Sequence, residues 1–357
     1  MNLIKGVINM GMEEAKKVKD WVEEAVLEVI NSRIPTKFYI YNSSVFTVPY
    51  DTVARIIAVG KGGAANNSGN VGGGGGGTAV KLAKLKKGDK ITITLNDEKT
   101  TAACKDWAIS GYNGGDGYFV DVYSYLPGPG GAAEGGGKKS SSTGSLIVGN
   151  DIQLIAGGSG GSRYSDGGNN AISKGGKKVQ DGHGGGGASY FGGNGCCSYY
   201  DYQNGSDGGD GLYGGGNGGP GYGTQSNSTT IIRGGNGGNS IYGYGGKGGR
   251  STTKYKMQPV GGNGGYGGIR GGKGGLAYWD SNGSGSNATS PTKTKGQDGE
   301  SGIYYPMFNT PSQLPIGSGQ GAGCYSNVDN GEYRYSPPGV GAVIIELGED
   351  RFLDTYV

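Results

Sequence analysis

Runs of apolar residues and short alternating stretches predict β-strands in the first 156 residues and again near the end of the chain. Ile91, Ile93 and Leu95 alternate with threonine, as in a strand that buries one face. Predicted strands cover residues 38–41, 45–48, 53–59, 78–82, 91–95 and 118–125, with two more between 146 and 156. Residues 127–139 are expected to form a loop. The apolar run 340–347 is expected to close the same sheet, giving a β-sandwich-like domain.

Residues 1–36 carry a different spacing, of four and three residues, which is typical of a short coiled-coil helix. The seam consists of the apolar Ile4, Ile8, Val18, Val22 and Val29 with the small Gly11, Ala15 and Ala25. Pro35 ends the helix. An isolated helix of this length is marginal in water, so the seam, with Ile8, Val18, Val22 and Val29 as oligomerisation residues, should be buried against copies of itself or another protein. Packing on its own β domain is the alternative.

Glycine dominates residues 157–302 and makes up 84 of the 357 residues of the chain. Residues 261–269 read GGN-GGY-GGI, and the GG-x-GG core recurs at 214–219, 234–238, 245–249 and 271–275. A period of three matches the polyproline-II helix, which rises ~3.1 Å per residue and has no internal hydrogen bonds. Its N–H and C=O groups must therefore find partners on neighbouring segments. We expect a bundle of polyglycine-II helices, with glycine on two edges and the third residue facing solvent; disorder is the alternative.

Composition and charge exclude several classes of protein. Twelve prolines are too few for collagen. The 32 basic and 29 acidic residues are scattered and leave a net charge of +3, which indicates neither a nucleic-acid-binding stripe nor a membrane-surface patch. No apolar stretch of ~18 residues predicts membrane insertion. Cys104, Cys196, Cys197 and Cys324 have neither disulfide-framework nor zinc spacing and are expected to be reduced thiols.

Catalytic and cofactor-binding patterns are weak. His183 is the only histidine, and its spacing suggests no nucleophile with a second orienting residue. Strings that resemble GxGxxG follow from the glycine content and lack a surrounding βαβ unit. Aspartates beside glycine, such as Asp166 and Asp207, do not form a calcium-binding nonapeptide repeat. We therefore expect no enzyme activity, no cofactor and no metal site.

Aromatic residues cluster in the breaks between glycine-rich runs. Tyrosine and tryptophan among Ser, Gly and Asn give large amphipathic contact area at low entropy cost, as in antibody paratopes, and they stack on sugar rings. The candidate receptor-binding residues are Tyr199, Tyr200, Tyr202, Tyr255, Tyr278, Trp279, Tyr304, Tyr305 and Phe308. The alternative is that these rings cap the ends of the glycine-rich segments or pack between loops.

The order of motifs resembles the glycine-rich domain of phage and prophage tail-fibre proteins. In that family a Phe-Thr-Val-Pro strand leads into a hydrophobic strand and a polyglycine run, as residues 45–49, 53–59 and 72–77 do here. Residues 78–94, which include Gly88-Asp89-Lys90, and the closing residues 338–346 also fit. The resemblance spans about residues 44–348.

This resemblance implies a tail-fibre or tail-tip adhesin of a virion, made in the host cytoplasm, whose loops bind a host cell-surface receptor, either a glycan or an outer-surface protein. It also implies contacts with other tail proteins and a homotrimer, as in other fibres. A structural virion component without receptor binding, such as a head fibre, baseplate or spacer, is the main alternative. A secreted glycine-rich matrix protein is the third.

The expected fold is therefore mainly β with an irregular glycine-rich part. An N-terminal helix, 1–36, serves oligomerisation or attachment and precedes a β domain, 37–156. A polyglycine-II bundle with receptor-facing loops, 157–302, is inserted before a return segment with the closing strand, 303–357.

Overall fold

The computed structural model describes residues 37–65, 71–121, 124–140, 144–162, 165–178, 185–196, 202–219, 221–223, 230–240, 246–249, 251–254, 258–266, 273–274, 276–280, 297–298, 323–326, 334–336 and 339–348. Across these residues the chain is mainly β and has no helix. The segment predicted as an N-terminal helix lies outside them, and so do its seam residues Ile8, Val18, Val22 and Val29.

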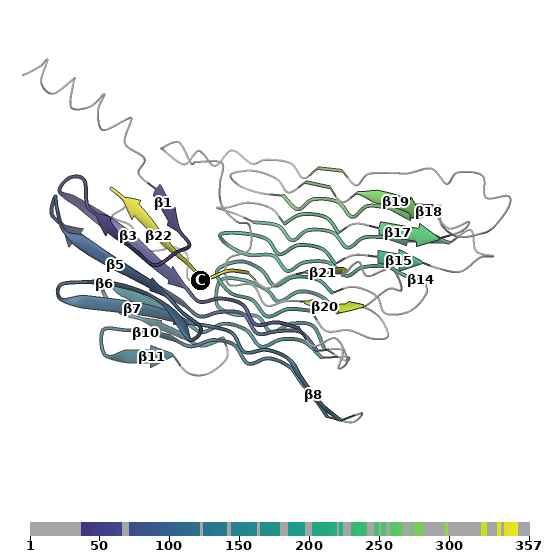
Figure 1. The fold of residues 1–357 in the computed structure, drawn as a ribbon, viewed down its shortest axis with the longest axis horizontal. Helices are drawn as coiled ribbons and strands as arrows, with labels where there is room; N and C mark the ends of the chain where they lie inside the picture. The colour runs from purple at the N-terminus through teal and green to yellow at the C-terminus, as the bar shows by residue number, and fades with distance from the viewer. Residues whose placement is uncertain are drawn as a thin grey trace, which may run out of the picture.

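Two six-stranded antiparallel sheets form a β domain at one end of the molecule (Figure 1). The first has the order β1 (Lys37–Ile40), β22 (Ala342–Leu347), β3 (Thr52–Val59), β4 (Thr78–Leu85), β13 (Ile152–Ile155) and β12 (Leu146–Val148). The second has the order β11 (Lys138–Ser140), β10 (Ala133–Gly135), β7 (Trp107–Tyr112), β6 (Lys99–Cys104), β5 (Lys90–Leu95) and β2 (Ser44–Thr47).

One hydrophobic core joins the two sheets face to face. Ile56 of β3 and Ile345 of β22 belong to the same buried cluster as Ile91 and Ile93 of β5 and Ile109 of β7. In β5, Ile91 and Ile93 are buried, while Lys90, Thr92 and Thr94 are exposed. The alternation that predicted a strand with one buried face is thus confirmed.

Most predicted strands lie where the sequence placed them, but three expectations need correction. The sequence analysis assigned no strand to residues 99–112, where β6 and β7 form, because alanine, threonine and serine weaken the apolar pattern there. Residues 118–125 fold as a hairpin, β8 (Tyr118–Asp121) and β9 (Ser124–Leu126), rather than as one strand. The expected loop 127–139 contains β10 and most of β11, which pairing with β7 brings into the sheet.

The strand near the C-terminus pairs with the first sheet, as expected, but inside it rather than at its edge. Strand β22 is hydrogen-bonded to β1 on one side and to β3 on the other. All six of its residues are buried. A segment almost 300 residues away from its partners along the chain is therefore needed to complete the sheet.

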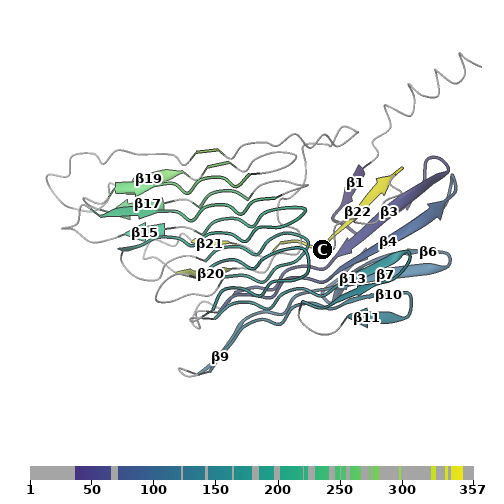
Figure 2. The ribbon, with the colours of Figure 1, turned by 180° about the vertical axis from the view of Figure 1, so that it is seen from behind.

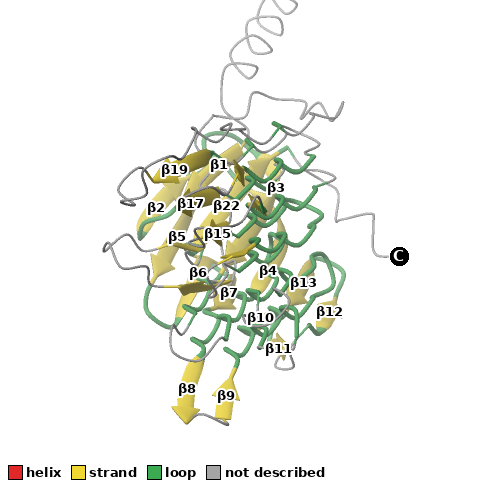
Figure 3. Ribbon diagram, turned by 90° about the vertical axis from the view of Figure 1, so that its right-hand side faces the viewer, coloured by secondary structure: helices red, strands yellow, loops and turns green. Residues whose placement is uncertain are grey.

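Beside the β domain, the chain runs back and forth in extended glycine-rich segments (Figures 1 and 2). We call these segments the glycine lattice and define it as residues 60–65, 71–77, 111–117, 127–132, 156–162, 165–178, 185–196, 204–219, 233–240, 246–249 and 261–266. Six short strands lie between or after the later lattice segments along the chain: β14 (Tyr202–Gln203), β15 (Gly221–Gly223), β16 (Ile231–Arg233), β17 (Ser251–Lys254), β18 (Gln258–Val260) and β19 (Ala277–Asp280). Strands β20 (Gly323–Ser326) and β21 (Arg334–Ser336) pair only with each other. Figure 3 shows the lattice segments end-on, with the β8–β9 hairpin projecting from one edge.

The lattice grows directly out of the sheets and so begins well before residue 157. Val59 of β3 pairs with Thr78 of β4, and the next step along is a hydrogen bond from Gly60 N–H to Gly77 O of 2.9 Å. Residues 156–162 follow β13 in the same way, and Gly75 N–H donates to Gly158 O at 2.8 Å. The β domain thus fixes the register of the first glycine segments.

A second hydrophobic cluster joins the lattice to the outer face of the first sheet. Ile57 of β3 and Ile344 of β22 lie in it together with Tyr190, Phe191 and Tyr213 from lattice turns. The rings of Tyr190 and Tyr213 stack with centroids 4.8 Å apart, and Phe191 meets Tyr190 edge-on at 5.5 Å. Phe191 is 1% exposed. Burial of these rings supplies the hydrophobic contribution that the glycine segments lack.

A buried carboxylate lies in β22 next to this cluster. Glu346 is 6% exposed and forms ion pairs with Lys37 of β1, at 2.5 Å, and with Arg55 of β3. Burial alone would raise the pKa of Glu346, but the two cations outweigh burial and lower the pKa. Three strands that are distant in the sequence are thereby linked through one charged group.

We expect Phe191→Ala to lower the free energy of unfolding by about 3–5 kcal/mol, because it removes a buried ring and leaves a cavity. Urea titration of the purified protein measures this loss. Val148→Ala is the matched control, since Val148 is 54% exposed and should change stability by less than about 0.5 kcal/mol. Equal midpoints for the two variants would show that the aromatic cluster does not hold the lattice to the sheet.

We expect acid to remove stability that depends on Glu346. A carboxyl whose folded pKa lies below its ordinary value of 4.5 stabilises the protein fully above that value, and this contribution disappears as the pH falls through the folded pKa. The free energy of unfolding should therefore fall more steeply below pH ~4.5 in the wild type than in Glu346→Gln. Parallel pH profiles for the two proteins would contradict the role given to the carboxylate.

Candidate functional site

Exposure in the glycine lattice repeats every three residues. Lys174 and Lys177 are exposed while the two glycines between them are buried. The same pattern runs through 233–240, where Arg233, Asn236 and Asn239 are exposed. In these two runs the third position of each triplet lies at the surface, as the sequence predicted, whereas Asn194, the third position of residues 192–194, is fully buried.

Close contact, not unusual backbone conformation, explains why the buried positions are glycine. The described glycines with positive φ are Gly88, Gly136, Gly137, Gly144 and Gly348, and all of them lie outside the lattice. A Cβ added at Gly246 would overlap the carbonyl oxygen of Gly216, and one added at Gly216 would overlap that of Gly193. Adjacent backbones touch at these positions, so only glycine fits.

Each segment also bonds to more neighbours than a β-strand can. Segment 71–77 exchanges backbone hydrogen bonds with segments 60–65, 111–117, 127–132, 156–162 and 185–196. Within it, Gly74 N–H donates to Gly115 O while the next residue, Gly75, donates to Gly158 O. Hydrogen bonds thus leave the segment in several directions around its axis, whereas a β-strand bonds only in the plane of its sheet.

The third positions are not merely solvated, because asparagine and aspartate there hold the next segment through a repeated two-bond unit. Asp207 Oδ1 accepts the N–H of Asn236 at 2.6 Å, and the following residue, Gly208, donates its N–H to the carbonyl of Asn236 at 2.9 Å. Both backbone groups of Asn236 are thereby satisfied. We call this unit the Asx clasp, defined by an Asx side chain and the N–H of the residue after it.

Among the residues that the structure describes, the Asx clasp occurs ten times between parallel segments. The clasping residues are Asn113, Asp116, Asn194, Asn204, Asp207, Asp210, Asn217, Asn236, Asn239 and Asn263. Several clasps are consecutive, so that Asp207 holds Asn236, Asn236 holds Asn263, and Asn263 holds Gln297. In nine of the ten, the residue after the Asx is glycine. Asx-Gly dipeptides were the sequence signal for these contacts, and the sequence analysis did not use it.

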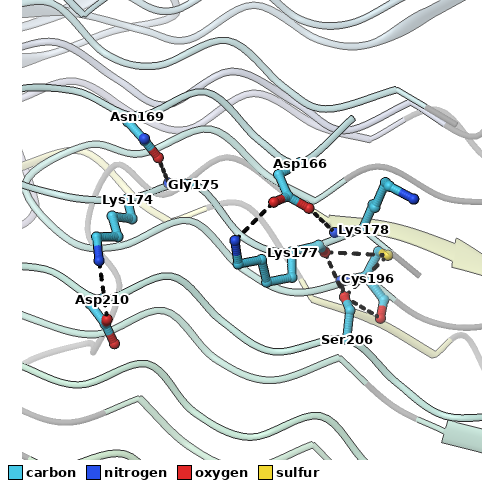
Figure 4. Close-up of polar contacts among 9 residues, drawn as sticks. All are labelled: Asp166, Asn169, Lys174, Gly175, Lys177, Lys178, Cys196, Ser206 and Asp210. Carbon is cyan, nitrogen blue, oxygen red and sulfur yellow. Dashed lines mark hydrogen bonds and ion pairs between the residues drawn. The ribbon is translucent and has the colours of Figure 1, made fainter. Parts of the chain in front are cut away.

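Asx side chains also bond to neighbouring segments that run in the opposite direction, but there the N–H of the residue after the Asx donates to a different residue (Figure 4). Asn169 Oδ1 accepts the N–H of Gly175 at 2.9 Å, and Asp166 Oδ1 accepts the N–H of Lys178 at 2.8 Å. Asp166 also forms an ion pair with Lys177 at 2.9 Å. Burial raises the pKa of Asp166, but the bonds from Lys178 and Lys177 more than compensate and lower the pKa.

The polar groups drawn in Figure 4 do not form a catalytic arrangement. Cys196 is buried, and its Sγ lies 3.2 Å from Ser206 Oγ and 3.7 Å from the carbonyl of Lys177 (Figure 4). Ser206 Oγ donates to the same carbonyl at 2.6 Å. These groups satisfy one another as structural partners, and within this cluster there is no base that could activate either nucleophile.

A four-stranded sheet lies toward the end of the lattice that is remote from the β domain (Figure 1). Its strands β15, β17 and β19 run parallel, and β14 pairs antiparallel with β15. Tyr222 pairs with Thr252, which pairs with Tyr278, so these three positions form one row across the strands. The sequence analysis did not include Tyr222 among the candidates, although it also lies in a break between glycine-rich runs.

The register separates two of the predicted receptor-binding residues. Trp279 pairs with Thr253, in the row next to that of Tyr278. Ser251 and Thr253 are fully buried, and successive positions of a strand alternate between the two faces of its sheet. The row of Tyr278 and the position of Trp279 therefore lie on opposite faces of this sheet, and the position of Trp279 shares the face of the buried Ser251 and Thr253.

Of the other candidates the structure places Tyr202, which lies in β14 and pairs with Gly223. Tyr199, Tyr200, Tyr255, Tyr304, Tyr305 and Phe308 lie outside the described residues, and so does His183.

Metal sites and membrane spans are absent from the part of the chain that the structure describes. No group of three or more His, Cys, Asp and Glu side chains is positioned to hold a metal ion there. Nor do the described residues include a helix that could cross a membrane. No protein-family model and no curated protein sequence matches this chain.

We expect adjacent substitutions at 246 and 247 to have opposite outcomes. Gly246→Ala should destabilise the protein by about 1–3 kcal/mol or more, because the new methyl group overlaps the backbone of Gly216. Lys247→Ala keeps the backbone N–H that Asn217 accepts at 3.0 Å and should change stability by less than about 0.5 kcal/mol. Thermal melts of both variants test this, and similar melting temperatures would disprove the close-contact explanation for glycine.

Proposed function

We propose that this protein is an adhesin at the tip of a virion tail fibre, in which the glycine lattice is a rigid scaffold that presents recognition residues to a host cell-surface receptor. The tail-fibre resemblance of the sequence motivates the proposal. The observation that carries it is the lattice itself. Extended segments bonded on several sides give a stiff platform whose exposed turns can vary without disturbing it.

The lattice segments are, in this proposal, polyglycine-II helices. Three observations support the assignment: the three-residue period of exposure, the contacts of one segment with five others, and lattice glycines at which a Cβ would overlap a neighbouring backbone. Pro127 and Pro129, which lie in segment 127–132, are compatible with it, because the proline ring fixes φ near the polyproline-II value.

The receptor-facing part is proposed to be the remote end of the lattice, with the row of Tyr222, Thr252 and Tyr278 as its described portion. This end lies away from the β domain (Figure 2), which precedes it in the chain. The N-terminal segment would then attach the β domain to other tail proteins or to further copies in a homotrimer. Tyrosine side chains suit recognition of either a glycan or a protein surface.

Binding of labelled protein to a panel of bacterial strains tests the adhesin proposal. For a strain that binds the wild type, Tyr278→Ala should weaken binding by roughly 30-fold, the effect of losing about 2 kcal/mol at an interface hot spot. The melting temperature should stay close to that of the wild type, since the row of Tyr278 lies on the face opposite the buried Ser251 and Thr253.

Val45→Ala provides the matched control, because Val45 is 55% exposed on β2 of the β domain and should leave binding unchanged. Equal binding by Tyr278→Ala, Tyr222→Ala and the wild type would exclude this end as the recognition surface. Failure of the wild type to bind any strain, with the protein present in purified virions, would favour the structural role without a receptor.

A further inference from the structure

Six of the ten parallel Asx clasps are built on Asn-Gly, the dipeptide most prone to deamidation. The asparagines are Asn113, Asn194, Asn204, Asn217, Asn236 and Asn263. Glycine after asparagine favours the reaction because no side chain hinders approach of its backbone nitrogen. Because this dipeptide recurs, the lattice contains asparagines prone to deamidation in several of its segments.

The reaction makes and breaks defined bonds. The backbone nitrogen of glycine attacks Cγ of the preceding asparagine, a new N–Cγ bond forms, the Cγ–Nδ2 bond breaks, and ammonia leaves with the proton from the glycine N–H. A water molecule then opens the resulting succinimide at either carbonyl. One product is aspartate, and the other is isoaspartate, whose backbone is one carbon longer.

The Asx clasp restrains both reacting groups. Gly218 N–H donates to the carbonyl of Lys247 at 2.8 Å, and Asn217 Oδ1 accepts the N–H of Lys247 at 3.0 Å. The hydrogen bond to Oδ1 holds the side chain that carries Cγ, and the bond from Gly218 holds the attacking nitrogen. Both groups must leave the neighbouring segment before the nitrogen can reach Cγ, so that the reaction requires the two bonds of the clasp to open.

We infer that the Asn-Gly pairs of the glycine lattice are latent deamidation sites that the Asx clasp keeps unreactive, one pair at a time. The inference does not depend on the proposed function. The two products have different consequences. Aspartate retains the clasp geometry, as Asp116, Asp207 and Asp210 already show. Isoaspartate lengthens the backbone by one carbon and breaks the three-residue period. A segment that is modified while it is detached from the lattice therefore cannot form the clasp again at that residue.

Peptide mapping by mass spectrometry after incubation in mildly alkaline H₂¹⁸O tests the inference, because ¹⁸O marks deamidation that occurred during the incubation. Native full-length protein and the same protein in urea are compared. We expect all six asparagines to deamidate at least roughly 30-fold more slowly in the native protein, since two hydrogen bonds must open together. Equal rates at these sites in the two conditions would overturn the inference.

Lys247→Pro separates the individual clasp from general folding. Proline at 247 keeps the carbonyl that Gly218 bonds but removes the N–H that Asn217 accepts. We expect Asn217 alone to deamidate several-fold faster in this variant, with Asn113 and Asn263 at their wild-type rates, and Lys247→Ala to behave as the wild type. No acceleration at Asn217 would refute protection by the clasp. Faster deamidation at all six asparagines would show that the lattice as a whole protects them, and this result would overturn the inference that each clasp protects its own Asn-Gly pair.

Discussion

Backbone hydrogen bonds between segments are the constraint from which the rest of this structure follows. An extended segment that does not bond to itself must place every N–H and C=O on a neighbour or in water. Segment 71–77 meets that demand with five neighbours, and the contacts are close enough that a Cβ at Gly75 would overlap the carbonyl of Ala188. Glycine is therefore required for contact, even though glycine loses more conformational entropy on ordering than any other residue. A single isolated segment of this kind could not be stable.

The β domain offsets part of that entropy because it orders the first lattice segments. Residues 60–65 and 71–77 continue β3 and β4, whose register is fixed by eight residue pairs and a hydrophobic core. Later segments are then added to a surface that already exists. The aromatic cluster around Phe191 anchors the lattice to the same sheet, and the Glu346 ion pairs hold β1, β3 and β22 together within that sheet. The lattice and the sandwich are thus parts of one hydrogen-bonded structure rather than two domains joined by a linker.

The sequence revealed the β-strands with strong apolar alternation, such as β5, and the three-residue period of the lattice. The sequence did not predict strands β6 and β10, because they consist of small and polar residues and their conformation depends on long-range pairing. The start of the lattice at residue 60 was hidden as well, since a glycine run after a strand reads equally well as a loop. Of the candidate site, the sequence could not show that Tyr278 and Trp279 lie on opposite faces of a sheet, because the face of each depends on pairing with β17.

The Asx clasp explains why recognition would concentrate at the ends of the segments. Asn236 is exposed, yet its Oδ1 holds Asn263 and its own N–H is held by Asp207. A residue in this position can change only to another short acceptor without releasing the next segment, so the flat sides of the lattice have little freedom to evolve new contacts. The row of Tyr222, Thr252 and Tyr278 in the remote sheet includes none of the ten clasping residues. In such a scaffold the residues that stabilise the fold differ from those that can diversify. The proposed adhesin requires this separation, because its recognition residues must change without loss of the fold.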